Sequence, residues 1–128
     1  MKNLIISILF VTIIFTNILA QNQEKSKEDI IKPKITFVEL GSDNCIPCKM
    51  MQPIMKSIEK KYGESVKVIF YDVWKDAGKP YAKKYGIKLI PTQVFLDASG
   101  KELMRHEGFF PEAEIDKFLL SQGLKTIN

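Results

Sequence analysis

A pair of cysteines constrains this chain more than any other feature of its sequence. Cys45 and Cys48 are the only cysteines among 128 residues, and they are spaced C-x-x-C. The apolar run 35–40 before them predicts a strand. The residues after them predict a helix, because apolar side chains recur there at helical spacing (Met51, Ile54, Met55 and Ile58). Cys45 is therefore expected at the N-terminus of a helix that follows a strand.

This position favours redox chemistry at the two thiols. The unpaired N–H groups and the positive end of the helix dipole stabilise an anion, so the pKa of the Cys45 thiol is expected to fall. The alternative is an inert disulfide that only stabilises the fold. A bridge between Cys45 and Cys48 closes a very short loop and constrains the unfolded chain little, which favours the redox interpretation.

Length and composition indicate one globular domain. A chain of 128 residues with 45% hydrophobic and 27% charged residues can bury a modest core without disulfides or metal ions to stabilise it. The net charge of +4 comes from lysines spread along the chain, with no basic block interleaved with aromatic residues, so nucleic-acid binding is not expected. A structural zinc site needs four ligands, and the chain offers only Cys45, Cys48 and its single histidine, His106.

The N-terminus carries a hydrophobic segment that predicts export. Residues 4–19 are nearly all apolar and Ala20 is a plausible cleavage position, so residues 1–20 are interpreted as a signal peptide. The alternative is an uncleaved membrane anchor, although the run is shorter than the roughly 20 residues that span a bilayer. Residues 21–33 are polar and charged and are expected to form a tether, and the folded domain is expected at 34–128.

The rest of the chain alternates between strand and helix patterns. Strands are predicted at 35–40, 66–73, 92–96 and 102–106, and helices at 45–62, 80–85 and 111–121. The first strand is apolar on both faces except at Glu39, which is typical of a central strand with helices on both sides. This order indicates an α/β fold without a second domain or repeat.

Several segments together resemble the thioredoxin family, in particular its exported bacterial members. The resemblance covers roughly residues 34–124 and rests on Phe37-Val38-Glu39, Cys45-Ile46-Pro47-Cys48-Lys49-Met50, Pro53, Tyr85-Gly86-Ile87, Ile90-Pro91-Thr92, the hairpin with Gly100, and Gly108. It implies a thioredoxin-like α/β fold with a central mixed four-stranded sheet flanked by helices. The first strand and helix of a full thioredoxin are expected to be reduced or absent.

The resemblance implies roles for the residues around the cysteines. Cys45 would attack the disulfide of a partner, and Cys48 would resolve the resulting mixed disulfide. Ile46 and Pro47 would tune the reduction potential and face the substrate. Glu39 matches a buried carboxylate whose raised pKa allows proton transfer with Cys48; the alternative is an edge carboxylate turned to water. No cofactor is implied.

The resemblance also points to a substrate groove beside the cysteines. Pro91 matches a proline that is cis in the family, whereas the alternative is an ordinary proline before a strand. Ile90 and Thr92 would offer backbone groups to an extended substrate segment. Gly108 would allow close backbone approach beside the same groove, or is a plain turn glycine.

The chain departs from the family in its active-site loop. Asn44 stands where thioredoxins usually have tryptophan, and Ile46-Pro47 replaces the usual Gly-Pro pair. Asp43 adds a negative charge that is expected to raise the pKa of Cys45 somewhat. These differences indicate a dedicated partner.

Three further features have structural interpretations. His106 is expected to be a surface or half-buried strand residue, and Trp74 is expected to pack at a strand end. The methionines near the cysteines are expected in the core (Met50, Met51 and Met55).

Together these features predict an exported thiol–disulfide oxidoreductase, either periplasmic or on the outer face of the cytoplasmic membrane, with a membrane tether as the alternative to a free protein. It is expected to be a monomer that reduces protein disulfides with electrons from a thiol-conducting membrane protein. Apocytochrome c is one substrate class by family analogy. An oxidase or isomerase is the alternative within the same chemistry, and a Cu(I)-binding chaperone that uses Cys45, Cys48 and a methionine is the alternative from another class.

Overall fold

The computed structural model describes residues 33–127, so the predictions for residues 1–32 lie outside the described part of the chain. Its strands and helices follow in the order β1 (Ile35–Gly41), α2 (Ile46–Tyr62), β2 (Val66–Asp72), α3 (Lys79–Lys84), β3 (Thr92–Asp97), β4 (Glu102–Glu107) and α4 (Glu112–Ser121). Every one of them lies within one residue of its predicted bounds. Between residues 33 and 127, no helix is both long and apolar enough to cross a membrane.

The four strands form one mixed sheet in the order β2-β1-β3-β4. β1 is parallel to β2 and antiparallel to β3, and β3 is antiparallel to β4. β1 therefore has a strand on each side, and all of its residues except Thr36 are buried. This confirms the expected α/β fold with a central mixed four-stranded sheet flanked by helices.

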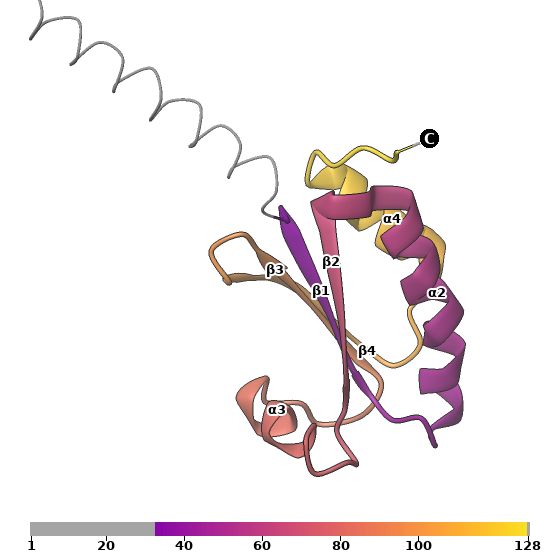
Figure 1. The fold of residues 1–128 in the computed structure, drawn as a ribbon, viewed down its shortest axis with the longest axis vertical. Coiled ribbons are helices and arrows are strands. Elements are labelled where there is room, and N and C mark those ends of the chain that lie inside the picture. The colour runs from indigo at the N-terminus through magenta and orange to yellow at the C-terminus, as the bar shows by residue number, and fades with distance from the viewer. Residues whose placement is uncertain (1–32, 128) are drawn as a thin grey trace, which may run out of the picture. The chain divides into compact units, whose positions relative to one another are not determined.

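Helices cover both faces of the sheet, with α2 and α4 on one face and α3 on the other (Figure 1). On the first face the rings of Phe37 and Phe95 stack at 4.7 Å and pack against α2 and α4 residues such as Ile58 and Leu119. On the second face a smaller cluster contains Val38, Leu40, Val73 and Val94. Because alternate residues of β1 point to opposite faces, its continuous apolar run supplies both clusters.

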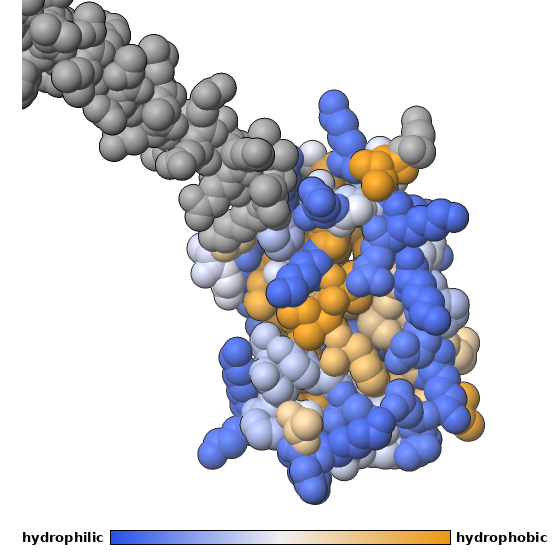
Figure 2. All heavy atoms as spheres, viewed as in Figure 1, coloured by the Kyte–Doolittle hydropathy of each residue, from blue (hydrophilic) through white to orange (hydrophobic). Residues whose placement is uncertain are grey.

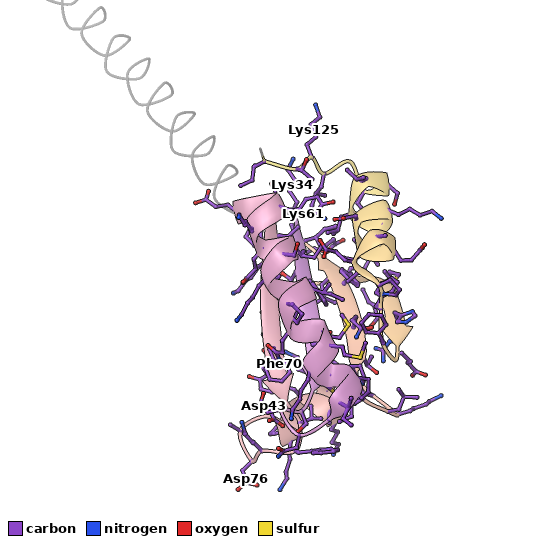
Figure 3. The ribbon with its side chains drawn as sticks, turned by 90° about the vertical axis from the view of Figure 1, so that its right-hand side faces the viewer. Lys34, Asp43, Lys61, Phe70, Asp76 and Lys125 are labelled. Carbon is purple, nitrogen blue, oxygen red and sulfur yellow. A yellow bond between two sulfur atoms is a disulfide. The ribbon has the colours of Figure 1, made fainter. Side chains whose placement is uncertain are left out.

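Polar side chains join the two helices of the first face. The Lys61 ammonium contacts Glu112 at 2.6 Å and Asp116 at 2.5 Å, and the Tyr62 hydroxyl donates to Asp116 at 3.1 Å. Burial, together with the Asp116 carboxylate, raises the pKa of Tyr62 to about 12. Figure 3 shows Lys61 at the end of the domain opposite Asp43 and Asp76, and Figure 2 shows hydrophilic side chains around an apolar area on one face.

Local signals in the sequence end the elements where they were expected to end. α2 runs through Pro53 as one helix and stops at Gly63, whose φ of 52° favours glycine. The turn between β3 and β4 is held by the Asp97 carboxylate, which accepts hydrogen bonds from the backbone N–H groups of Ser99 and Lys101. These turns depend on neighbouring residues alone, which is why the sequence predicts them well.

Replacing Gly78 with alanine is expected to destabilise the domain strongly. Gly78 lies where the loop after β2 enters α3, and a Cβ atom there would be 1.9 Å from the carbonyl oxygen of Asp72. Because that oxygen belongs to the backbone, the loop itself would have to move, at a cost of about 2–3 kcal/mol in the free energy of unfolding. Urea unfolding measures this cost. The exposed neighbour Ala77 provides the control, since Ala77→Ser is expected to change stability by less than about 0.5 kcal/mol. Equal stability of the two variants would contradict the close approach.

Candidate functional site

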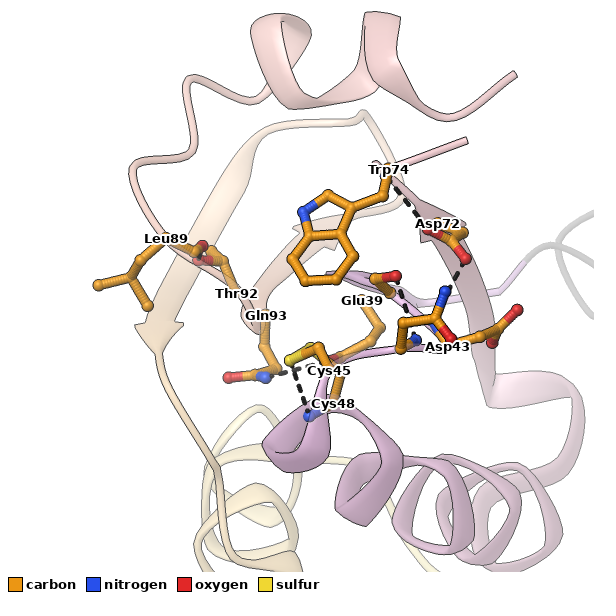
Figure 4. Close-up of a disulfide and its surroundings, with 11 residues drawn as sticks. Glu39, Asp43, Cys45, Cys48, Asp72, Trp74, Leu89, Thr92 and Gln93 are labelled. Carbon is orange, nitrogen blue, oxygen red and sulfur yellow. Dashed lines mark hydrogen bonds between the residues drawn. A yellow bond between two sulfur atoms is a disulfide. The ribbon is translucent and has the colours of Figure 1, made fainter. Parts of the chain in front are cut away.

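The two cysteines lie at the junction between β1 and α2, as the sequence predicts (Figure 4). They form a disulfide with a Cα–Cα distance of 5.2 Å. Cys45 is the N-cap residue of α2 and is 8% exposed, whereas Cys48 is fully buried in the first turn. Only the Cys45 sulfur is therefore positioned to meet a partner from solution.

The helix N-terminus provides a hydrogen bond to the Cys45 sulfur. The backbone N–H of Cys48 donates to the Cys45 Sγ atom at 3.3 Å. Pro47 lies between the cysteines and has no N–H to offer. The first turn of α2 contains no acidic residue. When the disulfide is reduced, this N–H group and the positive end of the helix dipole can stabilise a thiolate on Cys45.

Glu39 is buried in the sheet beneath the disulfide (Figure 4). Its side chain is 0% exposed, so the alternative of an edge carboxylate turned to water is excluded. Gly41 is two residues further along β1 and lies on the same face of the strand. A Cβ atom on Gly41 would be 3.2 Å from the Cys48 sulfur, so this face of β1 leads directly to Cys48.

Gln93 is the partner of Glu39, and the sequence alone does not reveal this pairing. The two residues face each other across β1 and β3, and the Gln93 side-chain amide donates to Glu39 Oε1 at 3.3 Å. Gln93 is also 0% exposed. The available signal in the sequence was a glutamine directly before the apolar run Val94-Phe95-Leu96 of a predicted strand. The register of β3 against β1 places this glutamine opposite Glu39, and sequence patterns do not determine that register.

Burial raises the pKa of Glu39 to about 8, although the hydrogen bond from Gln93 lowers it in part. The second carboxyl oxygen, Oε2, has no hydrogen-bond partner in the described part of the chain. A single neutral donor does not replace the water that a buried carboxylate loses, so the protonated form is favoured. Glu39 can therefore hold or release a proton close to neutral pH, on the face of β1 that leads to the buried cysteine.

The loop before β3 passes the disulfide with a cis peptide bond between Ile90 and Pro91, as the resemblance implies. The Pro91 carbonyl accepts a hydrogen bond from the N–H of Gly108 at 2.8 Å, and the Thr92 hydroxyl donates to the Leu89 carbonyl at 2.7 Å. Ile90 has no backbone–backbone hydrogen bond within residues 33–127. Its N–H and carbonyl groups are therefore free to pair with an extended segment, whereas the Thr92 side chain is buried.

Gly108 has a structural role that explains its residue type. Its φ of 91° lies in the region that favours glycine, and its N–H fixes the Pro91 carbonyl. No atom lies within 4 Å of a Cβ built on it, apart from its chain neighbours. Gly108 therefore supports the loop of Pro91 through its backbone conformation, as a turn glycine does.

Asp72 connects the two loops on either side of the disulfide. Its carboxylate accepts backbone hydrogen bonds from Asp43 at 3.2 Å and Trp74 at 3.1 Å, and it lies 3.2 Å from the Lys75 ammonium. Burial alone would raise the pKa of Asp72, but these bonds and one from Ser42 outweigh it and lower the pKa to about 2. Hydrogen bonds to the ionised Asp72 carboxylate therefore join the loop before Cys45 to the end of β2.

Lys75 changes the expected effect of Asp43 on the cysteines. The Lys75 ammonium contacts the Asp43 carboxylate at 2.5 Å, across 32 residues of sequence. This pairing offsets the negative charge that was expected to raise the pKa of Cys45. Nothing close to Asp43 in the sequence indicates that a lysine 32 residues away pairs with it.

The structure corrects two other expectations. Trp74 does not pack at a strand end: it is 57% exposed, and its indole ring points toward the disulfide in Figure 4. Met50 is 51% exposed and is not part of the core, because it lies on the outer side of α2, whereas Met51 and Met55 are buried as predicted. His106 is half-buried and stacks on Phe110, which confirms the interpretation as a strand residue.

Replacing Asp72 with alanine is expected to loosen both loops at the disulfide. The N–H groups of Asp43 and Trp74 lose their acceptor, so their amide hydrogens are expected to exchange faster with solvent than in the unmodified protein. Hydrogen exchange followed by NMR measures this. Asp76→Ala is the matched control, because Asp76 is almost fully exposed and contacts only the Lys79 side chain. Unchanged exchange in Asp72→Ala would show that the loops hold without this carboxylate.

Comparisons with known proteins agree with this geometry. The family model described as "Thioredoxin-like domain" matches residues 20–123. The chain is 31% identical to thioredoxin from Bacillus subtilis over 85 residues, which cover 66% of this chain and 79% of that protein. It is 29% identical to thioredoxin from Acidithiobacillus ferridurans over 106 residues, which cover 82% and 95%.

A solved structure resembles the fold as well. The N21Q mutant thioredoxin from Halobacterium salinarum superimposes with a TM-score of 0.62 at 22% identity, covering 72% of this chain and 77% of that one. The match to the family model spans all four strands of the sheet and the cysteine pair. A C-x-x-C disulfide at a helix N-terminus, in this fold and with these relatives, supports thiol–disulfide oxidoreductase activity. The chain belongs to the family of thioredoxin-like domain proteins.

Proposed function

We propose that this protein is an exported reductase of protein disulfides. The observation that carries the proposal is the placement of the two sulfurs: Cys45 at the helix N-cap can reach a partner, and Cys48 is buried near a protonatable Glu39. The attacking thiol and the resolving thiol are thus distinguished by exposure. A purely structural disulfide has no need of a buried carboxyl beside it.

The reaction balances as a transfer of two electrons. The Cys45 thiolate attacks one sulfur of the partner disulfide, so a mixed disulfide forms and the first partner thiolate leaves and takes up a proton. The Cys48 thiol then loses its proton to the Glu39 carboxylate and attacks the Cys45 sulfur. This step releases the second partner thiolate and leaves the Cys45–Cys48 disulfide, which has given two electrons to the partner.

The surroundings of Cys45 favour reduction over oxidation. A strongly stabilised thiolate makes the reduced form too stable, and the protein then acts as an oxidant. Here Pro47 provides no N–H, and the Cys48 N–H is the one backbone donor to the Cys45 sulfur in the described part of the chain. The thiolate is therefore stabilised only moderately. Cys48 is fully buried, and burial disfavours a negative charge on its sulfur.

The cellular part of the proposal rests on the sequence. The apolar segment 4–19 supports export, so the domain acts outside the cytoplasm, where a membrane protein that conducts thiol reducing equivalents must keep it reduced. Protein disulfides that need reduction there are the substrate class, and apocytochrome c thiols before haem attachment are one candidate. We propose that the protein acts as a monomer in this role.

The reduction potential of the Cys45–Cys48 pair tests the direction of the reaction. The protein is equilibrated in dithiothreitol buffers, and the reduced fraction is measured by thiol alkylation and mass spectrometry. A reduction potential of about −250 mV or lower supports the reductase, because the potential of thioredoxin itself is about −270 mV. A value of about −120 to −180 mV would overturn the proposal in favour of an oxidase or isomerase.

A second experiment tests the electron source. The redox state of the protein is measured in exporting cells with and without a membrane electron conductor of the thiol type. Loss of the reduced fraction in the deficient cells supports the proposal, and an unchanged redox state contradicts it.

The copper chaperone receives no support from the geometry, because Met51 and Met55 are buried and Met50 lies exposed on the outer side of α2.

A further inference from the structure

A pair of polar side chains lies between the apolar core and the disulfide. Phe37 and Phe95 face each other across β1 and β3, and their rings stack at 4.7 Å. The next cross-strand pair on the same face, two residues closer to the cysteines, consists of Glu39 and Gln93. Both side chains are completely buried. The apolar layer between the sheet and α2 is therefore interrupted by one carboxyl and one amide before it reaches Cys48.

The hydrogen bonds of this pair are incomplete. The Gln93 amide donates to Glu39 Oε1 at 3.3 Å, whereas Glu39 Oε2 and Gln93 Oε1 have no hydrogen-bond partner in the described part of the chain (Figure 4). Unpaired buried polar atoms cost stability, and two apolar side chains would fill the same positions without that cost. Such a loss next to a reactive group is expected where the pair serves the reaction.

β2 and α2 offer the Glu39 carboxyl no second hydrogen-bond donor with a fixed charge. The register partner of Glu39 on β2 is the apolar Phe70. α2 contributes Cys48, whose proton is transferred in the release step. Asp72 is the charged residue at the end of β2, and its carboxylate is occupied by backbone N–H groups of the two loops and by the Lys75 ammonium.

β4 and α4 also leave the carboxyl to Gln93. His106 is the register partner of Gln93 on β4, but its Nε2 atom lies 3.1 Å from the Phe109 carbonyl oxygen. The acidic residues of α4 that face α2 pair with Lys61. Within residues 33–127, the Gln93 amide is therefore the one hydrogen-bond donor to the Glu39 side chain.

We propose that Gln93 is a positioning residue for the release of the partner: its amide holds Oε1 of the Glu39 carboxylate, so that the unpaired Oε2 takes the proton from Cys48. The inference rests on the proposed function, since it concerns the second step of the same exchange. The proton moves from the Cys48 sulfur to Oε2. The Cys48 thiolate then attacks the Cys45 sulfur and expels the partner thiolate, while Gln93 neither gains nor loses a proton.

The Gln93 amide is expected to act mainly on the ionised form of Glu39. A hydrogen bond to a carboxylate is stronger than one to a neutral acid, so the amide opposes the effect of burial on the pKa of Glu39. Without the amide, the carboxyl would lose its proton only at higher pH. Less of the carboxylate would then be available near pH 7 to accept the proton of Cys48.

Gln93→Met tests the proposal, because methionine has a similar length and no N–H donor. The reduced full-length protein is mixed with excess hydroxyethyl disulfide, and the fluorescence of Trp74, the single tryptophan, is followed by stopped flow. The rate rises linearly at low disulfide concentration, where attack by Cys45 limits it, and reaches a plateau where release limits it. The plateau at pH 7 is expected to fall about tenfold, or about 1.4 kcal/mol, while the initial slope stays unchanged.

The pH profile of the plateau is a second readout. Its midpoint is expected to move up by about one pH unit in Gln93→Met, near the lower end of the range for hydrogen bonds to charged groups. Gln93→Leu is expected to give the same plateau as Gln93→Met, although the shape of its side chain differs. Gln122→Met is the matched control, because Gln122 is exposed at the end of α4, and it is expected to keep both the plateau and the slope.

A double-mutant cycle separates positioning from general structural damage. In the Glu39→Gln background, Gln93→Met is expected to cause no further loss of the plateau, because Gln93 acts only through the carboxylate. A tenfold loss in that background as well would overturn the inference, and so would an unchanged plateau in Gln93→Met alone. Failure of the proposed function appears differently, because the unmodified reduced protein would then fail to react with hydroxyethyl disulfide at all.

Discussion

Replacing Cys45 with serine is expected to abolish disulfide reduction, because the only sulfur that a partner can reach is removed. Cys48 does not substitute for it, since its side chain is fully buried. The rate of reduction of a protein disulfide such as that of insulin is expected to fall to the rate of the uncatalysed exchange. Turbidity or thiol release measures this loss.

Replacing Cys48 with serine is expected to give a different result. Cys45 still attacks, but nothing resolves the mixed disulfide, so the variant accumulates covalently bound to its partner. Non-reducing gel electrophoresis shows this adduct, and a reductant releases it. Thermal unfolding of both reduced variants and the reduced unmodified protein controls for folding. Adducts that form through Cys48 in Cys45→Ser would contradict the assignment of the attacking thiol.

Replacing Glu39 with glutamine is expected to remove a large pH dependence of stability. The pKa of this carboxyl is about 8 in the folded protein and near the ordinary glutamate value of 4.5 in the unfolded chain. Between these values the folded state keeps a proton that the unfolded state has lost. Stability from this group is therefore fully present below pH 4.5 and is lost as the pH rises through 8, by roughly 4–5 kcal/mol in total at most. Urea unfolding at pH 5, 7 and 9 measures it.

The glutamine variant is expected to show little of this slope and to be more stable than the unmodified protein at pH 9. It keeps the size and hydrogen-bonding capacity of the side chain but cannot ionise. Gln93→Leu provides a second comparison: it removes the hydrogen bond that lowers the pKa of Glu39, so the loss of stability should move to higher pH. A full slope in Glu39→Gln would show that another group titrates.

The same carboxyl is expected to matter for catalysis. Glu39→Gln cannot accept the proton of Cys48, so the step that releases the partner is expected to slow by about 10²-fold, the lower end of the range for general acid–base catalysis. The first attack by Cys45 does not use this proton. Stopped-flow measurement of mixed-disulfide formation and decay separates the two steps, and equal slowing of both would argue for a general structural effect.

Most of the fold could be predicted because it depends on short-range patterns. The helical spacing after Cys48, the glycine at residue 63 and the Asp97 turn each depend on residues close in the chain, and the observed elements follow them. The burial of Glu39 was also predictable. A carboxyl in a strand that is apolar on both faces has no surface to turn to once helices cover that strand.

Residues that act across the sheet could not be predicted in the same way. Gln93 lies 54 residues from Glu39, and Lys75 lies 32 residues from Asp43. Their pairing depends on the register of β3 on β1 and on the path of the loop after β2. The exposure of Trp74 has a similar cause. An aromatic residue after a strand usually packs into a core. Here the hydrogen bond from the Trp74 N–H to the Asp72 carboxylate holds this residue at the disulfide, where its side chain is exposed.

The sequence by itself determined the order of elements, the position of the two thiols at a helix N-terminus and the need to bury Glu39, because local spacing and hydrophobicity decide these features. Only the tertiary structure decided the environment of the thiols: the amide that faces Glu39, the lysine that offsets Asp43, and the exposed Trp74 ring that points toward the disulfide (Figure 4). The physical reason is that pKa values and binding surfaces arise from groups that folding brings together from distant parts of the chain.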